Sequence, residues 1–474
     1  MAAQIGSFVS GRAIPLGTPG IEIVRPQDGQ AMGTMLEAGE AGVAAAVTSA
    51  QDAYLAARGT PLHGRIAWLR AAARGLTDAA EEVAALICAD IGKPIRLARF
   101  EAGRGADFIE NCAAVASQLG GELLPLDAAA NGAGAIGMVR RVPYGVVGAI
   151  TPFNAPANLL IQKVAPAIAM GNAVVVKPAP GGLRAALRIA EVFAAAGLPP
   201  GLFNVVSGDR DTALALVAHP LVRAVTFTGG TAAGDALARA AGARKFLAEL
   251  GSNAANLVFA DADLATAAKK IAAAGFEASG QQCISAQRVL VQREALERFM
   301  PAFVSAAAAL KVGPAEDPAT DVGPMVHRAS VKRVMAMVED ALARGAKAAL
   351  MPVRQDATVS PGILLDVPNE ARLWQEEVFG PVVLVRPFDT VEEAIALAND
   401  SPFGLQAAAF TGSLATAMRL ADGMEVGSLW INEASRFRLD MYPFGGVKSS
   451  GVGREGIRYA MEELSQLKFV GIRP

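Results

Sequence analysis

Between about residues 145 and 251, short apolar runs alternate with longer amphipathic stretches, and this alternation constrains the fold more than any other feature. The runs are "GVVGAITPF", "NAVVVKP", "LFNVVSG", "AVTFTG" and "KFLAELG". A strand covered by helices on both faces needs apolar residues at consecutive positions, whereas a half-exposed strand alternates apolar and polar ones. The pattern therefore predicts a doubly wound parallel α/β sheet, in which ligands bind at the carboxyl ends of the strands.

The remaining sequence predicts further elements on both sides of this sheet. A second α/β region is expected from about residue 252 to 445, with strands at "RVLVQ", "GILLDV" and "PVVLVRPF". Residues 40–118 carry apolar residues at three- and four-residue spacings, which is typical of helices. Two strand-like segments, an excursion at about 120–141 and an apolar tail at about 465–472, each lack a partner nearby in the sequence.

Bulk properties narrow the class of protein. A chain of 474 residues exceeds one ordinary hydrophobic core, and a net charge of -2 with 19% charged residues argues against nucleic acid as a partner. Its three cysteines form no disulfide framework, and three histidines are too few for a His-rich metal site. The N-terminus shows no signal-peptide pattern, and no stretch reaches the roughly 18 apolar residues of a membrane span. We expect a cytoplasmic protein with neither a metal nor a membrane partner.

The stretch "GQQCISAQR" makes Cys283 a candidate nucleophile. A cysteine attacks as the thiolate and needs access, a base and donors for the oxyanion that it creates. Glycine and amide residues around Cys283 supply close backbone approach and polar groups, whereas Cys88 and Cys112 lie on apolar helix faces and are expected to serve in packing. The plainer alternative is that Cys283 is a small buried residue, which is the usual state of a free cysteine.

Four other stretches place polar groups at the ends of predicted strands. Glu249 of "ELGSN" is expected to be a solvent-facing acid at the end of the last strand, and Asn154 of "TPFNAPAN" is a fixed amide between prolines. Lys177 of "VVVKPAP" is placed to meet a ribose or phosphate, and Gly230 and Thr231 of "FTGGTAAG" open a helix whose amides can face an anion. Each has a plainer use as a surface or turn residue, and a glycine pair after a strand is common in parallel sheets.

Seven motifs in order resemble the aldehyde dehydrogenase superfamily: "PFNAP", "VVKPA", "FTGGTAAG", "ELGSN", "GQQCISAQR", "EEVFGPV" and "PFGGVKSSGVGREG". The resemblance covers the chain from about residue 20 to 474. The segments "INEASRFRLDMYPFGG" and "GREGIRYAMEELSQLK" resemble the subgroup that includes the lactaldehyde and non-phosphorylating glyceraldehyde-3-phosphate enzymes.

The resemblance implies a two-step oxidation of an aldehyde to the carboxylic acid. Cys283 would attack the carbonyl, with the oxyanion held by the Asn154 amide and by the backbone N–H of Cys283. After hydride transfer to a nicotinamide, Glu249 would activate the water that hydrolyses the thioester. It also implies a discontinuous NAD(P)-binding domain (residues 1–119 and 142–248), a catalytic domain (249–445) and a small β oligomerisation element (120–141 and 456–474).

The resemblance further implies which residues bind the cofactor. Lys177 would meet the adenosine ribose, Glu377 the nicotinamide ribose, and Phe379 the surroundings of the nicotinamide, while Phe153 would line the active site where many relatives have tryptophan. The expected cofactor-binding set is Phe153, Lys177, Pro180, Gly208, Gly229, Gly230, Glu377 and Phe379.

Two departures from the family pattern concern the choice between NAD and NADP. Gly230 stands where many relatives have a serine that holds the pyrophosphate, so that contact would fall to main-chain amides. Pro180 stands where NAD-preferring relatives often have a glutamate, so a 2′-phosphate would not be repelled, and Arg184 is close enough in sequence to reach one. We expect NAD or NADP as cofactor, with NADP tolerated.

The substrate and the assembly are expected from the same resemblance. Arg436 or Arg438 would meet the polar or anionic tail of a small aldehyde, unless Arg438 and Asp440 simply pair to brace their loop. A hairpin that pairs with a neighbouring subunit in the family implies a homodimer or homotetramer. The tail at about 465–472 could alternatively fold back onto its own domain.

Three alternative functions remain. A relative that passes the acyl group to coenzyme A would typically lack Glu249, and a non-catalytic protein of the same fold would not need Cys283, Glu249 and Asn154 together. A cysteine protease would need a partner histidine, and none of the three histidines lies in a recognisable motif.

Overall fold

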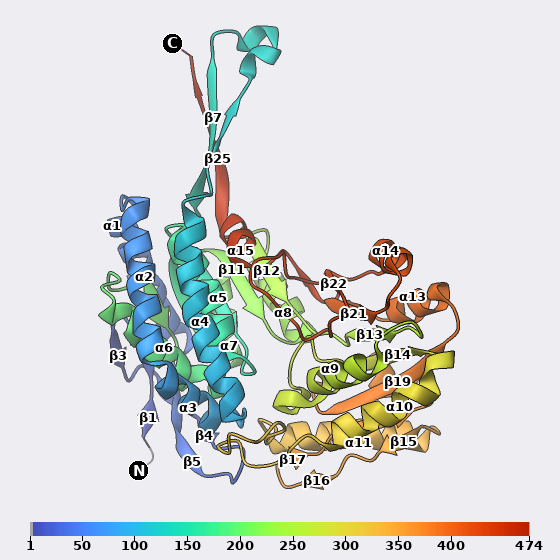
Figure 1. Ribbon diagram of the computed structural model, residues 1–474. Helices are drawn as coiled ribbons and strands as arrows, with labels where there is room; N and C mark the ends of the chain where they lie inside the picture. Colours follow the sequence, from blue (N-terminus) through green and yellow to red (C-terminus); the bar gives the residue numbers. More distant parts are fainter. Residues whose placement is uncertain (1–2, 474) are drawn as a thin grey trace.

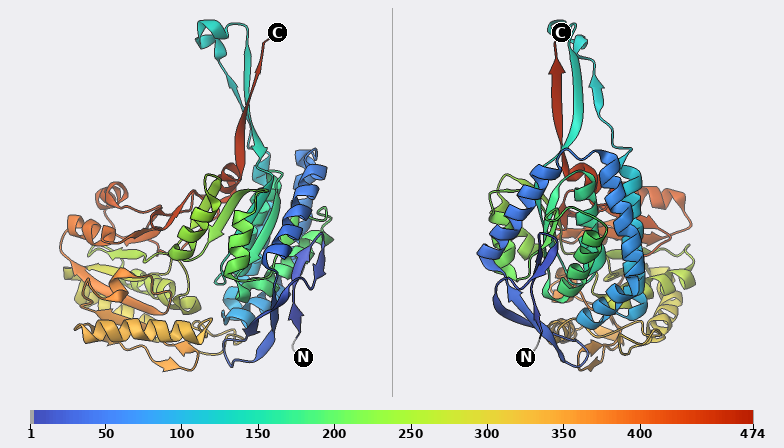
Figure 2. Two further views of the ribbon diagram at one scale, coloured as in Figure 1. Left: turned by 180° about the vertical axis from the view of Figure 1, so that it is seen from behind. Right: turned by 90° about the vertical axis from the view of Figure 1, so that its left-hand side faces the viewer.

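The computed structural model describes residues 3–473 and places two α/β units side by side, with a long β arm projecting from them (Figures 1 and 2). The first unit is built on an eight-stranded sheet in the order β24-β12-β11-β8-β9-β10-β2-β3. Its five central strands run parallel, and β2 and β24 add antiparallel edges. The strands are β2 (Ser7–Val9), β3 (Arg12–Ile14), β8 (Val146–Thr151), β9 (Ala173–Pro178), β10 (Phe203–Val205), β11 (Val222–Thr228), β12 (Lys245–Glu249) and β24 (Gly451–Val452).

The predicted parallel sheet is confirmed, because each of the five apolar runs forms one of its central strands. Helices cover both faces of this sheet, so every residue of β8 and β9 is buried. The helices of this unit are α1 (Gly39–Ala57), α2 (Leu62–Asp78), α3 (Ala80–Ile91), α4 (Ile95–Ala116), α5 (Pro156–Ala169), α6 (Leu183–Ala195), α7 (Arg210–Ala218), α8 (Thr231–Ala241) and α15 (Ile457–Glu463), with the short η3 (Pro180–Gly182).

The second unit contains a seven-stranded sheet in the order β15-β18-β19-β14-β13-β21-β22, parallel except at β15. Successive residues of β14 enter different hydrophobic cores, with Leu290 on one face and Val289 and Val291 on the other. A core on each face explains why the predicted strands lack polar alternation. The strands are β13 (Ala255–Val258), β14 (Arg288–Gln292), β15 (Lys347–Leu350), β18 (Gly362–Leu365), β19 (Val382–Phe388), β21 (Gln406–Phe410) and β22 (Ser428–Ile431).

Helices pack on both faces of this second sheet (Figure 1). They are α9 (Leu264–Phe276), α10 (Arg293–Ala308), α11 (Arg328–Ala343), α12 (Arg372–Gln375), α13 (Val391–Asn399) and α14 (Leu414–Gly423), with η4 (Glu277–Gly280) after α9. Two small ribbons, β16 (Arg354–Gln355) with β17 (Thr358–Val359) and β20 (Phe403–Gly404) with β23 (Val447–Lys448), complete the unit. The domain boundaries given above stay a prediction.

The arm joins the excursion to the C-terminal tail. Strand β7 (Ile136–Pro143) pairs with β6 (Glu122–Leu124) on one side and, over eight residue pairs, with β25 (Ser465–Ile472) on the other. The tail thus finds its partner far away in the sequence: it folds back onto the excursion of the same chain, and the two segments are antiparallel partners. Two short helical turns, η1 (Leu126–Ala128) and η2 (Ala130–Gly132), form the tip.

One small sheet near the N-terminus was not predicted. Strand β5 (Ala31–Glu37) pairs with β1 (Gln4–Ile5) and with β4 (Thr18–Val24). Of the seven residues of β4, five are exposed, so this strand gives little apolar signal.

Candidate functional site

Two cavities meet at the carboxyl ends of the first sheet. One, of about 740 Å³, runs past the ends of β8, β9, β11 and β12, and the other, of about 630 Å³, lies between α4 and the loop that carries Arg436. Three residues line both cavities: Asn154, Leu159 and Cys283. The fold therefore brings the candidate nucleophile and the candidate amide donor to one junction, although they stand 129 positions apart in the sequence.

The loop that carries Cys283 has an unusual backbone. Directly after α9, Ala278, Ser279 and Gly280 all adopt the left-handed conformation, with φ of 52°, 59° and 63°. Such residues cost roughly 1–2 kcal/mol each when they carry a side chain, and such strain gathers at functional sites. The Ser279 hydroxyl donates to the carbonyl of Gly323 (2.7 Å) and holds the turn in place.

The three cysteines differ in their exposure. Cys88 and Cys112 are buried in α3 and α4, whereas Cys283 is half-buried and reaches both cavities. Its surroundings raise the pKa of the Cys283 thiol to about 12, chiefly by desolvation, with the nearby Glu249 adding to the effect. The resting thiol is therefore protonated at neutral pH, and attack on a carbonyl requires a base that takes its proton.

Asn154 lies on a rigid connection between β8 and α5. Its carbonyl accepts a hydrogen bond from Lys93 Nζ (3.0 Å), and Lys93 in turn pairs with the buried Glu101. The other oxygen of Glu101 accepts from the backbone N–H groups of Ala157 (2.9 Å) and Asn158 (3.2 Å) at the start of α5. This buried pair, which sequence reasoning missed, clamps the segment on both sides of the Asn154 amide.

Two donors at the junction are free. Within residues 3–473, neither the side-chain amide of Asn154 nor the backbone N–H of Cys283 has a hydrogen-bond acceptor. Unpaired donors that face one cavity can stabilise an oxyanion formed there.

Glu249 ends β12, as predicted, but it does not face solvent. The residue is only 4% exposed, and neither carboxylate oxygen has a hydrogen-bond partner among residues 3–473. Burial, with the neighbouring Glu455 adding to it, raises the pKa of Glu249 well above its usual range. The expected solvent-facing acid is thus a buried one, because β24 adds a further strand outside β12.

The smaller cavity is lined by more cations than anions. Its basic residues are Lys93, Arg96, Arg104, Lys270, Arg436 and Arg438, and its acidic ones are Glu101, Glu277 and Glu433.

The two predicted substrate residues both line this cavity, and both already have protein partners. Arg436 pairs with Glu277 and donates to Gln282 Oε1 (2.7 Å). Arg438 donates to Gln162 Oε1 (2.9 Å) and Glu455 Oε2 (3.1 Å).

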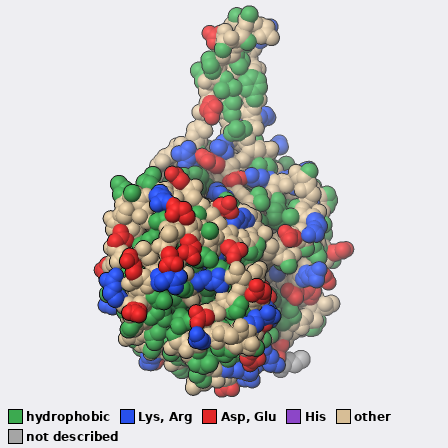
Figure 3. Space-filling model, turned by 90° about the vertical axis from the view of Figure 1, so that its right-hand side faces the viewer, with side chains coloured by type: hydrophobic (Ala, Val, Ile, Leu, Met, Phe, Trp, Pro, Cys, Tyr) green, Lys and Arg blue, Asp and Glu red, His purple; other side chains and the backbone are tan. Residues whose placement is uncertain are grey.

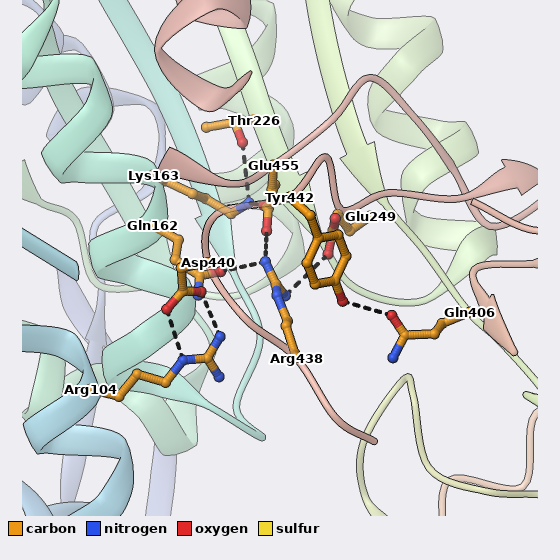
Figure 4. Close-up of polar contacts among 10 residues, drawn as sticks. All are labelled: Arg104, Gln162, Lys163, Thr226, Glu249, Gln406, Arg438, Asp440, Tyr442 and Glu455. Atoms are coloured by element: carbon orange, nitrogen blue, oxygen red, sulfur yellow. Dashed lines mark hydrogen bonds and ion pairs between the residues drawn. The ribbon is translucent and has the colours of Figure 1, made fainter. Parts of the chain in front are cut away.

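The predicted brace between Arg438 and Asp440 is wrong. Asp440 instead accepts from Arg104 (2.9 Å) and from Gln162, as Figure 4 shows. These partners lie on α4 and α5, far from the loop in the sequence, so the local sequence could not predict them.

The larger cavity has the features of a dinucleotide site. At one end it is lined by the apolar residues Ala213, Leu214 and Leu237. Midway, Gly230 precedes α8 without any side-chain cap, and a Cβ at Gly230 would meet open space, so the amides of the first turn are available to an anion. Lys177, whose pKa burial lowers, makes one long hydrogen bond, to the carbonyl of Gly208 (3.3 Å).

The other end of the larger cavity approaches Cys283. Glu377 accepts a hydrogen bond from the backbone N–H of Ser252 (3.0 Å), and burial raises its pKa to about 7. Phe379, with φ of 45°, packs edge-on against Phe153 at 5.9 Å between ring centroids. A carboxylate and two aromatic rings beside the thiol suit a ribose and a nicotinamide.

Two of the predicted cofactor residues do not line this cavity. Pro180 begins η3, one residue beyond the lining residue Ala179. Gly208 lies behind the lining, where a Cβ would meet Thr212 Oγ1 at 2.3 Å and Glu37 Oε1 at 2.5 Å. The remaining predicted cofactor residues line it, namely Phe153, Lys177, Gly229, Gly230, Glu377 and Phe379.

Arg184 does not point toward a free ligand site. Its guanidinium forms a bidentate ion pair with the buried Asp90 on α3, with Nε to Oδ1 at 2.8 Å. Asp209 and Arg210, which sequence reasoning missed, line the cavity near Lys177, and Asp209 acts electrostatically on Lys177.

Among residues 3–473, no three His, Cys, Asp or Glu side chains are arranged to hold a metal ion. No helix within the same range has the length and apolar character needed to cross a bilayer.

Comparisons with known proteins agree with this geometry. The model of the aldehyde dehydrogenase family matches residues 16–470. The 3-sulfolactaldehyde dehydrogenase of Priestia aryabhattai is 40% identical, over 90% of this chain and 89% of that protein. The crystal structure of NADP-dependent glyceraldehyde-3-phosphate dehydrogenase from Bacillus halodurans, complexed with NADP, is 34% identical with a TM-score of 0.96 and covers 99% of both chains. Lactaldehyde dehydrogenase from Escherichia coli, also a crystal structure, is 32% identical with a TM-score of 0.96 and covers 100% of both chains.

The family match spans both units and nearly all of the arm, and it includes every residue placed at the junction of the two cavities. Two of the named relatives have activities that belong to the predicted subgroup, so the resemblance stated from the sequence is confirmed. The chain belongs to the aldehyde dehydrogenase family.

Proposed function

We propose that this protein oxidises a small polar aldehyde to its carboxylic acid with NAD(P)+ through a covalent bond to Cys283. One observation carries the proposal: Cys283 and Asn154 lie where a cavity suited to a dinucleotide meets a second cavity rich in cations. The reaction needs a thiol and an oxyanion donor at the same carbonyl, and at this junction Cys283 and Asn154 line both cavities.

The residues of the chain divide the chemistry among them. Cys283, once deprotonated, adds to the aldehyde carbon, and the free N–H groups of Asn154 and of Cys283 itself receive the oxyanion. Bound NAD(P)+ supplies the hydride acceptor. Glu249, the carboxylate that acts electrostatically on the thiol, is the candidate base, first for the thiol and then for the water that hydrolyses the thioester.

The cofactor would be held along the larger cavity. Lys177 would donate to the adenosine ribose, the first turn of α8 would bind the pyrophosphate, and Glu377 would accept from the nicotinamide ribose. Either NAD or NADP fits, because Asp209 and Arg210 lie together near Lys177: the carboxylate suits a 2′-hydroxyl and the guanidinium a 2′-phosphate.

The smaller cavity would bind the aldehyde. Its excess of cations favours a substrate with a polar or anionic tail, which Arg436 and Arg438 would meet. The sulfonate in the name of the relative from Priestia aryabhattai supports such a tail, because a sulfonate would occupy the same kind of surroundings.

Assembly into a homodimer or homotetramer completes the proposal. The arm extends away from both units, and Figure 3 shows hydrophobic side chains along it. Leu123 is 74% exposed, Leu467 63% and Phe469 54%. Such exposed apolar side chains beside strand edges favour association with another subunit.

The test is a screen of short aldehydes against NAD+ and NADP+, with and without coenzyme A, followed by the absorbance of the reduced nicotinamide. Activity independent of coenzyme A is expected, since Glu249 provides the water-activating base; strict dependence on coenzyme A would favour the acylating alternative.

Variants then test the residues. Cys283→Ala is expected to abolish oxidation and keep cofactor binding, whereas Cys88→Ala and Cys112→Ala, at buried cysteines that line neither cavity, control for the loss of a thiol. Glu249→Gln is expected to give one rapid burst of reduced cofactor and then slow turnover. Substantial turnover by Cys283→Ala with any good substrate would contradict the mechanism.

A further inference from the structure

Four buried charges meet beside the active site, and Arg438 lies between two of them. Figure 4 shows its guanidinium directed toward Glu249 on one side and Glu455 on the other. Arg438 Nη2 lies 3.1 Å from Glu455 Oε2, and Nη1 lies 3.9 Å from Glu249 Oε2. The fourth charge, Lys163, donates to Glu455 Oε1 (2.7 Å) and to the Thr226 hydroxyl (3.1 Å).

The two carboxylates differ in the hydrogen bonds that they accept. Glu455 receives hydrogen bonds from both cations, whereas neither oxygen of Glu249 receives one. Among residues 3–473, Arg438 is the only cation with a nitrogen within 4.0 Å of a Glu249 oxygen. Burial acts on both carboxyls, but Lys163 and Arg438 hold the pKa of Glu455 below its ordinary value, while that of Glu249 is raised. Of the two carboxyls, Glu249 is therefore the one whose surroundings favour the protonated form.

The position of Arg438 is fixed from several sides. Its guanidinium carbon lies 3.6 Å above the ring centroid of Phe444. Gln162, which accepts from Arg438, is itself bonded to Asp440 (3.2 Å). A guanidinium held in this way hydrogen-bonds Glu455 through Nη2 and keeps Nη1 3.9 Å from Glu249 Oε2, so its charge acts on both carboxylates.

We propose that Arg438 is a positioning residue that divides its charge between Glu455 and Glu249 and thereby sets the pH above which Glu249 can serve as a base. The inference rests on the proposed role of Glu249 and adds a residue to it. The ionisable groups that face Glu249 are Arg438, Lys163, Glu455, Cys283 and Tyr442. Of these, Arg438 alone links the two carboxylates.

The test separates acylation from hydrolysis. With propionaldehyde, a neutral probe, the burst of reduced cofactor reports hydride transfer, and the following linear rate divided by the burst amplitude reports thioester hydrolysis. Both are recorded from about pH 6 to about pH 9. In Arg438→Met, the acidic limb of the hydrolysis profile is expected to move up by about one pH unit or more, because a cation that favours the ionised form of Glu249 is gone.

Further variants test whether Arg438 acts through the two carboxylates. Glu455→Gln removes the charge that repels the Glu249 carboxylate. In this variant the acidic limb of the hydrolysis profile is therefore expected to move to lower pH. The double variant Arg438→Met/Glu455→Gln is expected to return toward the wild-type limb, and Arg438→Lys to recover part of the shift. Melting temperatures establish that each variant is folded.

Arg436→Met is the matched control. Arg436 lines the same cavity two residues away, but it pairs with Glu277 and Gln282 and touches neither carboxylate. In Arg436→Met, the acidic limb of the hydrolysis profile is expected to stay at the wild-type pH, even if KM for the aldehyde changes.

Two failures are distinguishable. If Glu249→Gln hydrolyses the thioester at the wild-type rate, the proposed role of Glu249 is wrong. If Glu249→Gln stalls but a folded Arg438→Met keeps the wild-type limb, or slows hydrolysis equally at every pH, Glu249 remains the base and only the role of Arg438 is overturned.

Discussion

Glu377 is a buried carboxyl that lines the larger cavity near Cys283. Burial raises its pKa to about 7, against the lowering effects of the Ser252 N–H and of Arg333. The ionised form would accept from ribose hydroxyl groups, whereas the protonated form loses acceptor capacity.

We therefore expect cofactor affinity to be highest above about pH 7, where Glu377 is ionised. The affinity should fall by about tenfold as the pH drops below that value, because hydrogen bonds to a charged group are lost. Fluorescence titration of NAD(P)H across pH measures the effect. In Glu377→Gln, affinity should be lower and independent of pH over the same range; a variant that keeps the wild-type pH dependence would assign it to another group.

Residue 180 provides a test of cofactor choice. Pro180→Glu places a carboxylate one residue beyond the cavity lining near Lys177, and like charges at close range repel a 2′-phosphate. We expect kcat/KM for NADP to fall about tenfold more than kcat/KM for NAD. Pro180→Gln controls for size and for the lost proline. Equal effects on both cofactors would mean that the adenosine ribose lies away from residue 180.

Single residues were predictable where a local motif carried them. Cys283, Asn154 and Lys177 stand in short runs, and the structure places all three on the lining of the larger cavity. The partner of Arg184 was not predictable, because Asp90 lies 94 residues away on another helix. Likewise, the burial of Glu249 could not be predicted locally, because β24, which pairs with β12 beside it, lies about 200 residues later in the sequence.

At the scale of elements, the turn before Cys283 tolerates little change. A Cβ at Gly280 would lie 2.3 Å from the carbonyl oxygen of Gly380, in a residue with φ of +63°. We expect Gly280→Ala to lower the free energy of unfolding by roughly 2–3 kcal/mol and to slow the burst of reduced cofactor.

Gly197→Ala is the matched control. Gly197 also has positive φ (+82°), but its Cβ would meet nothing within 4 Å, so about 1 kcal/mol of conformational strain is expected. Urea unfolding compares the two variants. Equal losses would mean that contact with Gly380 adds nothing and that the loop can shift to accept a side chain.

Elements were predictable in proportion to their burial. Strands β8, β9, β11 and β12 appear as apolar runs because helices cover both faces of their sheet. Strand β4 is mostly exposed and pairs only with β5, so its sequence carries no apolar run.

At the scale of the whole molecule, the arm is the feature most open to test. Removing residues 465–474 deletes β25, leaves β7 with one unpaired edge and takes away Leu467 and Phe469. We expect the truncated protein to shift toward monomer and to melt at a lower temperature, measured by light scattering over a concentration series.

The double variant Leu467→Glu/Phe469→Glu keeps the backbone pairing of β25 while charging its exposed side chains, and it should weaken assembly without a comparable loss of melting temperature. An unchanged oligomer in both variants would remove the arm from the proposed interface. The pairing of β25 with β7 could not be foreseen from local sequence, because more than 300 residues separate the two strands.

The junction of the two cavities also has a consequence for how ligands would enter and leave the enzyme. Among residues 3–473, only Asn154, Leu159 and Cys283 line both spaces, so under the proposed function aldehyde and cofactor would each have a compartment of their own. Neither reactant needs to leave before the other can exchange, so a carboxylic acid product should compete with the aldehyde and not with NAD(P)+. Reduced cofactor, conversely, would be able to depart while an acyl group still occupies Cys283, which would leave the larger cavity open to the water that hydrolyses the thioester.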